Sequence, residues 1–321
     1  MWGPLARALD VAVAYSAGHQ ARFFGRTGES DYRRSFHDYL RGRLKYMPRI
    51  DPPPRVATGD PRTAEGRRAP PTATYRLQID RGGELVETRF DYFARGYGGR
   101  VLIVYHHGLG EIPQDMTFRW LLLRGRGPEI PADLICYHAT GHHTLRELND
   151  LLSTLGGFEK LVGDGMMAMR AIARAYRRHY DRVVCFGASL GGLVAIAEAA
   201  LSGSFDLNVS LIAHLDLVEV ISATAFRHLV DRDFLARCPL DLVRLGIDAD
   251  RLAAAAQRRL VMINGIHDAY FRIGRARELW QRFERIGHYE IPQGHVSAAG
   301  ATRTVKRALL TALRDRQVVA A

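Results

Sequence analysis

Short apolar runs alternate with helical stretches from residue 101 onward, and this alternation limits the chain to few architectures. The runs are continuously apolar, as strands of a parallel sheet are when helices cover both of its faces. They read VLIVYHHG, ADLICYHAT, RVVCFGAS, NVSLIAHL, RLVMING and HYEIPQGH, and helical stretches lie near residues 118–123, 158–180, 190–201, 273–286 and 296–316. The pattern predicts a doubly wound, mostly parallel α/β sheet.

The rest of the chain divides into an opening strand pair, an N-terminal extension and an insertion. The segments TYRLQI and LVETRFDYF predict antiparallel strands that open the sheet. Residues 1–72 combine two helical stretches with a linker too rich in proline for a helix or a central strand. Residues 217–258 are longer than a βα loop requires and carry helical spacing, also around 252–256, which predicts a small helical cap. The α/β core is therefore expected in residues 73–216 and 259–321.

The charge pattern argues against a nucleic-acid partner, although the net charge is +11. Only Lys45, Lys160 and Lys306 are lysines, so arginine supplies nearly all of the positive charge, and the arginines are dispersed. No basic tract is interleaved with aromatic residues, as nucleic-acid binding would favour. The charge is therefore interpreted as a solvated surface.

Cysteine use and hydropathy indicate the compartment. Cys136, Cys185 and Cys238 form neither a disulfide framework nor a thiolate metal site, which predicts a reduced, cytoplasmic protein without a metal. No apolar stretch reaches the roughly 20 residues that cross a bilayer. Arg7 and Asp10 interrupt the apolar start, so a secretory signal is not expected. The second helical stretch is basic and aromatic, which leaves contact with a membrane surface open, although such helices more often pack on their own domain.

The segment most informative about function is VVCFGASLGG, in which an apolar strand runs into G-x-S-x-G and then into an alanine-rich helix. A strand that reverses so sharply into a helix exposes the Ser189 hydroxyl on a strained turn, and the flanking glycines allow close approach of the two elements. The N–H of Leu190 then lies at a helix N-terminus, where a developing oxyanion is stabilised. Because a serine hydroxyl needs a base to become a good nucleophile, the motif requires partners elsewhere in the chain.

With this segment the sequence resembles the α/β-hydrolase superfamily, in its serine esterase and lipase-like members, over about residues 73 to 316. The resemblance implies an oxyanion-hole amide just after a His-Gly dipeptide at the end of the family's third strand. Here VLIVY runs into HHGLG, which gives that position to Leu109, beside Leu190. His106 and His107 are weak candidates for substrate contacts, with a structural role at the strand end as the alternative.

The resemblance also implies an acid after a late strand and a histidine after the last one. RLVMIN is followed by G-I-H-D, which supplies Asp268, and I-P-Q-G-H supplies His295. With Ser189 they stand in the chain order that the family requires. Asp216 also ends a strand and is the alternative acid. His142 lies in a loop near the expected pocket mouth and is a further weak candidate for substrate contact, while the histidines around it match no zinc-ligand signature.

These residues together predict a serine hydrolase that cleaves a carboxylic ester through an acyl-enzyme. Ser189 attacks a carbonyl, His295 takes its proton, Asp268 orients the imidazole, and no cofactor is required. A thioesterase, a lactonase and a peptidase use the same groups and are not ranked by the sequence. Two alternatives are a non-catalytic binding protein on the same fold and a lipid hydrolase that uses the N-terminal helices at a membrane. The expected partner is a small acyl substrate, with no oligomeric state indicated.

Overall fold

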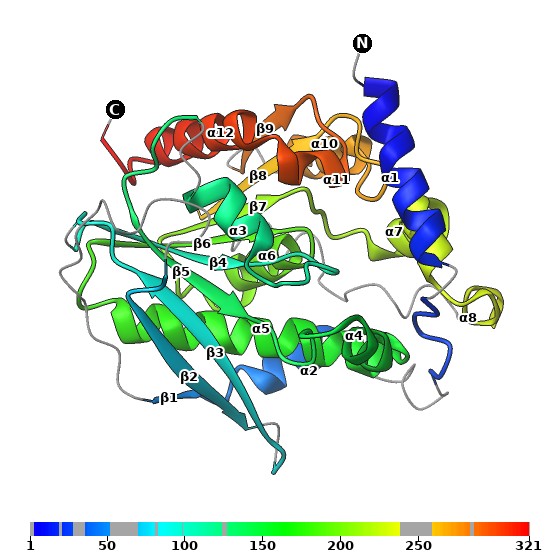
Figure 1. Cartoon of the computed structure of the whole chain (residues 1–321), viewed down its shortest axis with the longest axis horizontal. Coiled ribbons are helices and arrows are strands. Elements are labelled where there is room, and N and C mark those ends of the chain that lie inside the picture. The colour runs from blue at the N-terminus through cyan, green and yellow to red at the C-terminus, as the bar shows by residue number, and fades with distance from the viewer. Residues whose placement is uncertain are drawn as a thin grey trace.

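The computed structural model describes residues 3–18, 21–27, 36–51, 70–80, 83–97, 99–123, 127–237, 259–282 and 286–320. Within these residues, nine strands form one sheet in the order β1-β2-β3-β5-β4-β6-β7-β8-β9 (Figure 1). The strands are β1 (Arg49–Asp51), β2 (Ala73–Asp80), β3 (Leu85–Phe93), β4 (Val101–His106), β5 (Asp133–His138), β6 (Arg182–Ala188), β7 (Leu207–Leu211), β8 (Leu260–Gly265) and β9 (Gly287–Ile291). The first three pair antiparallel and β4 to β9 are parallel, which confirms the predicted mostly parallel α/β sheet.

The continuous apolar runs become the central strands. Every residue of β4, β5, β7 and β8 is buried, and in β6 only Arg182, at the start of the strand, is exposed. Such strands cannot alternate in polarity because helices cover both of their faces. Packed on one face are α5 (Leu155–Tyr176) and α6 (Leu190–Leu201), and on the other η3 (Arg119–Leu123) and α12 (Thr302–Asp315), so that two separate hydrophobic cores enclose the sheet (Figure 1).

The remaining helices of the core are short. They are α3 (Met116–Phe118), α4 (Leu145–Leu152), α10 (Ile273–Arg282) and α11 (His295–Gly300). The helical stretch expected over 296–316 is therefore divided into α11 and α12 at Ala301, which has non-helical backbone angles. This break sets α11 off as a separate short helix that begins at His295.

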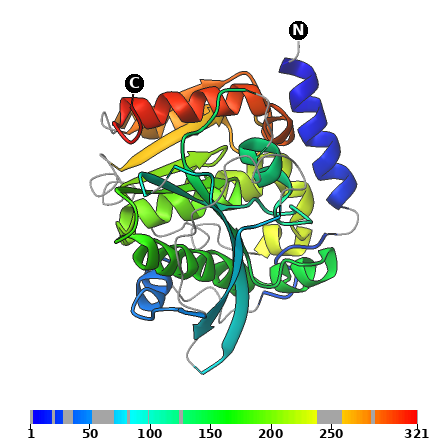
Figure 2. The same ribbon diagram turned by 60° about the vertical axis from the view of Figure 1, so that its left-hand side comes forward.

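The N-terminal extension contains the two expected helices, α1 (Gly3–Gly18) and α2 (Phe36–Arg43). Helix α2 packs against α5, whereas α1 contacts α11 and η4 (Ala225–Leu229) and lies along the side of the molecule (Figure 2). Part of the expected linker is an edge strand instead, since β1 pairs with β2 just before Pro52. Residues 52–69 of that linker lie outside the described residues. No helix among the described residues is both long and apolar enough to cross a membrane.

The region expected to form a cap begins with three short helices. They are α7 (Leu217–Ala223), η4 and α8 (Arg232–Arg237). The helical spacing expected around 252–256 falls outside the described residues.

The strand order places two loops side by side. Strand β4 lies between β5 and β6, with His106 of β4 opposite Gly187 of β6 in the parallel register. The chain leaves β4 toward β5 on one side, whereas β6 pairs with β4 on the other. Ligands of open α/β sheets bind at the carboxyl ends of strands where the order reverses in this way. The turn after β4 and the turn after β6 meet at that point.

Candidate active site

The turn from β6 into α6 holds Ser189 in a strained conformation. Its φ is 52° and its ψ is −109°, a region that costs a non-glycine residue about 1–3 kcal/mol. Both glycines of the motif are required by close backbone approach, because a Cβ at Gly187 would lie 2.0 Å from the Gly191 carbonyl oxygen. A Cβ at Gly191 would likewise lie 2.0 Å from the carbonyl oxygen of His106. The tight packing of β4, β6 and α6 thus presents the serine hydroxyl at the carboxyl edge of the sheet.

The three side chains singled out by the sequence meet at this edge. His295 Nε2 lies 2.9 Å from Ser189 Oγ, and His295 Nδ1 lies 2.9 Å from Asp268 Oδ2. With the ring proton on Nδ1, the imidazole donates to the carboxylate and Nε2 is free to accept the proton of the serine hydroxyl. This arrangement can generate a serine nucleophile by general-base catalysis.

Asp268, rather than Asp216, faces the imidazole. The second oxygen of Asp268, Oδ1, accepts hydrogen bonds from the N–H groups of Tyr270 and Phe271, each at 2.8 Å, which fixes the carboxylate. Asp216 has other contacts: its Oδ1 accepts from Glu219 N–H at the start of α7, and its Oδ2 lies 3.2 Å from Arg275 Nε. The structure therefore separates the two candidates by position.

The turn after β4 is shaped by hydrogen bonds on both sides of Leu109. Gly108 N–H donates to Glu111 Oε1 at 2.7 Å, and Gly110 N–H donates to His142 Nε2 at 3.1 Å. Leu109 and Leu190 both line the cavity that contains Ser189. Leu190 is the first residue of α6, so its N–H has no acceptor within the helix. Their amides remain the candidates for the oxyanion hole that the sequence named.

The three histidines that the sequence offered as candidates for substrate contact do not face the cavity beside Ser189. His106, His107 and His142 are fully buried, and none lines the cavity beside Ser189. Burial lowers the pKa of His106 and of His142 to about 4 and lowers that of His107 as well. As neutral rings they accept backbone hydrogen bonds, His107 from Ala139 and His142 from Gly110. These contacts fit the alternative of a structural role, in which the histidines support the turn after β4.

The electrostatics of the site favour a charged imidazole. Burial lowers the pKa of His295, but the carboxylates of Asp268, Asp10 and Glu111 raise it, and the net shift is upward from 6.5. Glu111 is itself deeply buried, and burial raises its pKa to about 7. An imidazolium formed during proton transfer would therefore be stabilised by its surroundings.

Ser189 and His295 open into an apolar cavity of about 510 Å³. Its walls include residues of α1, α4, α5, α6, α7, η4 and α11 and of the turns after β4 and β8. They include Val13, Ala17, Phe24, Leu109, Phe158, Leu193, Leu217, Val220, Ile221, Phe226, Leu229 and Phe271. No Lys, Arg or Asp is among the described residues that line it, and Glu111 and His295 are its ionisable groups apart from Tyr270. A cavity of this composition fits an uncharged, apolar group.

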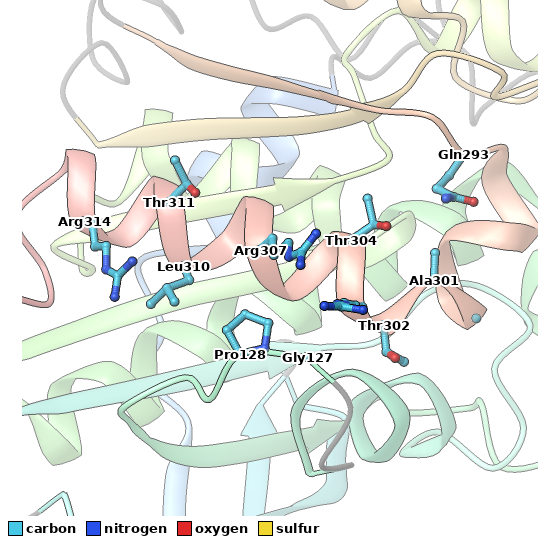
Figure 3. Close-up of a pocket in the computed structure, with 12 residues that line it drawn as sticks. Gly127, Pro128, Gln293, Ala301, Thr302, Thr304, Arg307, Leu310, Thr311 and Arg314 are labelled. Atoms are coloured by element: carbon cyan, nitrogen blue, oxygen red, sulfur yellow. The ribbon is translucent and has the colours of Figure 1, made fainter. Parts of the chain in front are cut away.

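A larger cavity, of about 960 Å³, lies along α12 (Figure 3), and its lining shares no residue with that of the apolar cavity. Side chains of arginine and threonine line it, including Arg307, Arg314 and Thr304 (Figure 3), and Arg303 is also part of the lining. Neither Ser189 nor His295 belongs to its lining, and no serine, cysteine or histidine is among the described residues that line it. The larger cavity is therefore not the one that contains the candidate catalytic residues.

Among the described residues, no group of three or more His, Cys, Asp or Glu side chains is arranged to hold a metal ion.

Sequence reasoning gave no role to Asp10, which the structure brings to the site. Its carboxylate accepts hydrogen bonds from the backbone of His295, at 2.7 Å, and of Val296, at 2.8 Å. The sequence offered one indication, because Asp10 is the one acidic residue in the first 18 residues. Its contact with residues 295 and 296 could not be predicted, because no local sequence pattern indicates a contact between segments so far apart in the chain.

Proteins with a similar fold occur among solved structures. No protein-family model and no curated protein matches the chain. An esterase of Pyrococcus furiosus aligns with a TM-score of 0.53 at 14% identity, over 82% of this chain and 98% of that one. Acetyl xylan esterase 1 of Thermoanaerobacterium sp. gives 0.50 at 14% identity, over 94% and 98%. A peroxisomal α/β-hydrolase of Saccharomyces cerevisiae gives 0.52 at 12% identity, over 78% and 90%.

These similarities span nearly the whole length of the solved proteins and most of this chain. At such low identity they concern the fold, and the chemistry must be argued from the site itself. The sheet order, the turn after β6 and the solved structures agree: this chain has the α/β-hydrolase fold.

Proposed function

We propose that this protein is a serine hydrolase that cleaves carboxylic esters with an apolar acyl group. The observation that carries the proposal is the pair of hydrogen bonds from Ser189 through His295 to Asp268 at the wall of an apolar cavity. Several solved structures with this fold are described as esterases, which supports the same reaction class. A cytoplasmic location remains a prediction from the cysteine pattern.

The proposed reaction has two steps. Ser189 Oγ attacks the ester carbonyl while its proton passes to His295 Nε2, and the Leu109 and Leu190 amides stabilise the oxyanion. The imidazolium then gives the proton to the leaving alcohol. In the second step His295 takes a proton from water, which attacks the acyl-enzyme. The imidazolium then returns that proton to Ser189 Oγ as the bond between Oγ and the acyl carbon breaks, which releases the acid and restores the serine hydroxyl.

A panel of nitrophenyl esters of increasing acyl length tests this function on the purified protein. Turnover that increases from acetate to longer acyl chains is expected, because the cavity wall is apolar. Absence of turnover at every chain length would contradict ester hydrolysis. Thioester, lactone and peptide substrates run in parallel distinguish the other acyl-transfer reactions, and a fluorophosphonate probe separates any of them from a binding protein.

The acyl-chain preference should depend on Val220, which is buried on α7 and lines the cavity. Val220→Trp would fill part of that space, and each methylene accommodated in an apolar pocket contributes about 1–3 kcal/mol. The ratio of kcat/KM for octanoate over acetate esters is therefore expected to fall about tenfold or more. Val218→Trp, two residues along the same helix and outside the cavity lining, is the matched control. Equal effects of both variants would place the acyl chain elsewhere.

The activity should be lost on the acid side of a pKa above 6.5. His295 must be neutral to accept the serine proton, and because the neighbouring carboxylates raise its pKa, protonation sets in at a higher pH than for an ordinary histidine. We expect kcat/KM to fall as pH drops through that raised pKa. Glu111 titrates in the same range, so Glu111→Gln, whose amide oxygen can still accept from Gly108, removes that second titration. The acid limb that remains in this variant belongs to His295 and should lie at a lower pH than in the wild type, because one of the carboxylates that raise the pKa of His295 is gone. A profile that stays flat well below pH 6.5 would argue against His295 as the base.

A further inference from the structure

Helix α1 reaches the candidate active site through one buried carboxylate. Asp10 is completely buried, and its two oxygens accept three backbone hydrogen bonds. Oδ2 accepts from His295 N–H at 2.7 Å and from Ala269 N–H at 3.1 Å, and Oδ1 accepts from Val296 N–H at 2.8 Å. Because a buried carboxylate is costly unless its oxygens are paired, three amides aimed at one side chain make a built contact.

These three amides belong to the two segments that carry the acid and the base. Ala269 follows Asp268 in the loop after β8, whereas His295 and Val296 are the first two residues of α11, which follows β9. Asp10 therefore links the loop after β8 to the start of α11, and both of them to α1. Since Ser189 Oγ, the imidazole and the Asp268 carboxylate must keep two hydrogen bonds at 2.9 Å, a small relative shift of these two segments would break the alignment.

Two further contacts lie around Asp10. The hydroxyl of Tyr270 donates to the carbonyl oxygen of Asp10 at 3.1 Å, and the Tyr270 ring lies 4.6 Å from the His295 ring, centroid to centroid. A Cβ at Gly294 would lie 2.8 Å from Asp10 Oδ2 and 2.9 Å from the carbonyl oxygen of Ala6. The residue before His295 must therefore be small for α1 to approach this closely.

The charge of Asp10 also acts on the imidazole. The carboxyl groups that face His295 are Asp268 after β8, Asp10 from α1 and Glu111 from the turn after β4, and the rings of Tyr270 and Phe271 lie against it. Each of the three carboxylates raises the pKa of His295. Removal of one of these charges should lower that pKa.

We propose that Asp10 is a positioning residue of the hydrolase. It fixes the loop that carries Asp268 relative to the start of α11, where His295 lies, and it stabilises the imidazolium formed during acyl transfer. The inference rests on the proposed function. It makes α1 part of the active site, and Val13 and Ala17 of the same helix also line the acyl cavity. Substrate that packs against α1 thus contacts the helix that orients the base.

The test compares Asp10→Asn with the wild-type full-length protein. Asparagine offers one oxygen and one NH₂ group to three N–H donors, so at least one donor then faces another donor. The rate of fluorophosphonate labelling and kcat/KM for a nitrophenyl ester are expected to fall by about 10- to 100-fold. The acid limb of kcat/KM should also move to lower pH, a change that partial unfolding does not produce. Leu9→Asn, at an exposed neighbour on the same helix, is the matched control.

The outcomes separate this inference from the function on which it rests. Slow labelling and a moved acid limb in Asp10→Asn, with Leu9→Asn like the wild type, support the positioning role. A wild-type labelling rate in Asp10→Asn, an acid limb that does not move, or an equal loss in Leu9→Asn would overturn it. A wild-type protein that is not labelled at all overturns the proposed function and this inference with it.

A second variant keeps the test decisive if Asp10→Asn fails to fold. Gly294→Ala leaves the carboxylate charge in place but puts a methyl group 2.8 Å from Asp10 Oδ2, which forces the two apart. Labelling should slow because the start of α11, which carries His295, moves. Labelling at the wild-type rate would overturn the positioning role.

Discussion

Ser189→Ala is expected to abolish fluorophosphonate labelling and to lower ester hydrolysis by about 10⁴- to 10⁶-fold, which is the order of loss when a serine nucleophile is removed. The variant deletes the only atom that forms the acyl bond, while φ and ψ at residue 189 are already held by the turn between β6 and α6. Folding should persist, because the substitution removes only the hydroxyl group and leaves the packing around residue 189 unchanged. Labelling followed by intact-protein mass spectrometry measures the effect directly.

A matched serine lies at the other end of the same helix. Ser202 is the residue after the last turn of α6, and its hydroxyl lies 2.6 Å from that of Ser204. Ser202→Ala should lose about 0.5–1.5 kcal/mol of stability from that hydrogen bond and should keep full labelling. Persistent labelling of Ser189→Ala, or its loss in Ser202→Ala, would assign the nucleophile to another residue.

Asp268→Asn is expected to lower kcat by about 10⁴-fold with little change in the structure. An asparagine NH₂ group facing His295 Nδ1 favours the tautomer that carries its proton on Nε2, which can no longer accept a proton from Ser189. The carboxylate is held by the Tyr270 and Phe271 amides, so the side chain cannot turn away to avoid this. Steady-state kinetics on a nitrophenyl ester, with the melting temperature of each variant, measure the effect.

Asp216→Asn is the control for this prediction, because Asp216 was the competing candidate. It caps α7 through Glu219 N–H, and asparagine is about as good an N-cap as aspartate. The variant should therefore retain both stability and activity, apart from the ion pair with Arg275 at the surface. A large loss in Asp216→Asn with little loss in Asp268→Asn would reverse the assignment.

The strands, the helices and the turn at Ser189 were predictable from the sequence, because patterns of neighbouring residues determine the backbone geometry of such elements. A continuous apolar run signals a strand covered on both faces, and G-x-S-x-G between a strand and a helix signals the sharp turn that now holds Ser189 at φ 52°. The doubly wound sheet and the α6 helix followed from these patterns, as did the position of His295 after the last strand. The break between α11 and α12 did not, because the apolar spacing continues across Ala301.

Side-chain partners depended on which strands became neighbours. Asp216 and Asp268 both follow strands, and the choice between them was made by β8 pairing with β9, where His267 N–H donates to the Gln293 carbonyl and brings Asp268 to the imidazole. His106 and His107 lie in a motif that suggests a pocket, yet their rings turn into the protein.

Asp10 is the clearest case of what only the tertiary structure decided. Its partners His295 and Val296 lie at the other end of the chain, and no periodicity connects a carboxylate in an N-terminal helix with those amides. The sequence by itself determined the sheet, the nucleophile turn and the order of the three proposed catalytic residues. The packing of α1 decided what holds them together, because a hydrogen bond between distant segments depends on how whole elements dock.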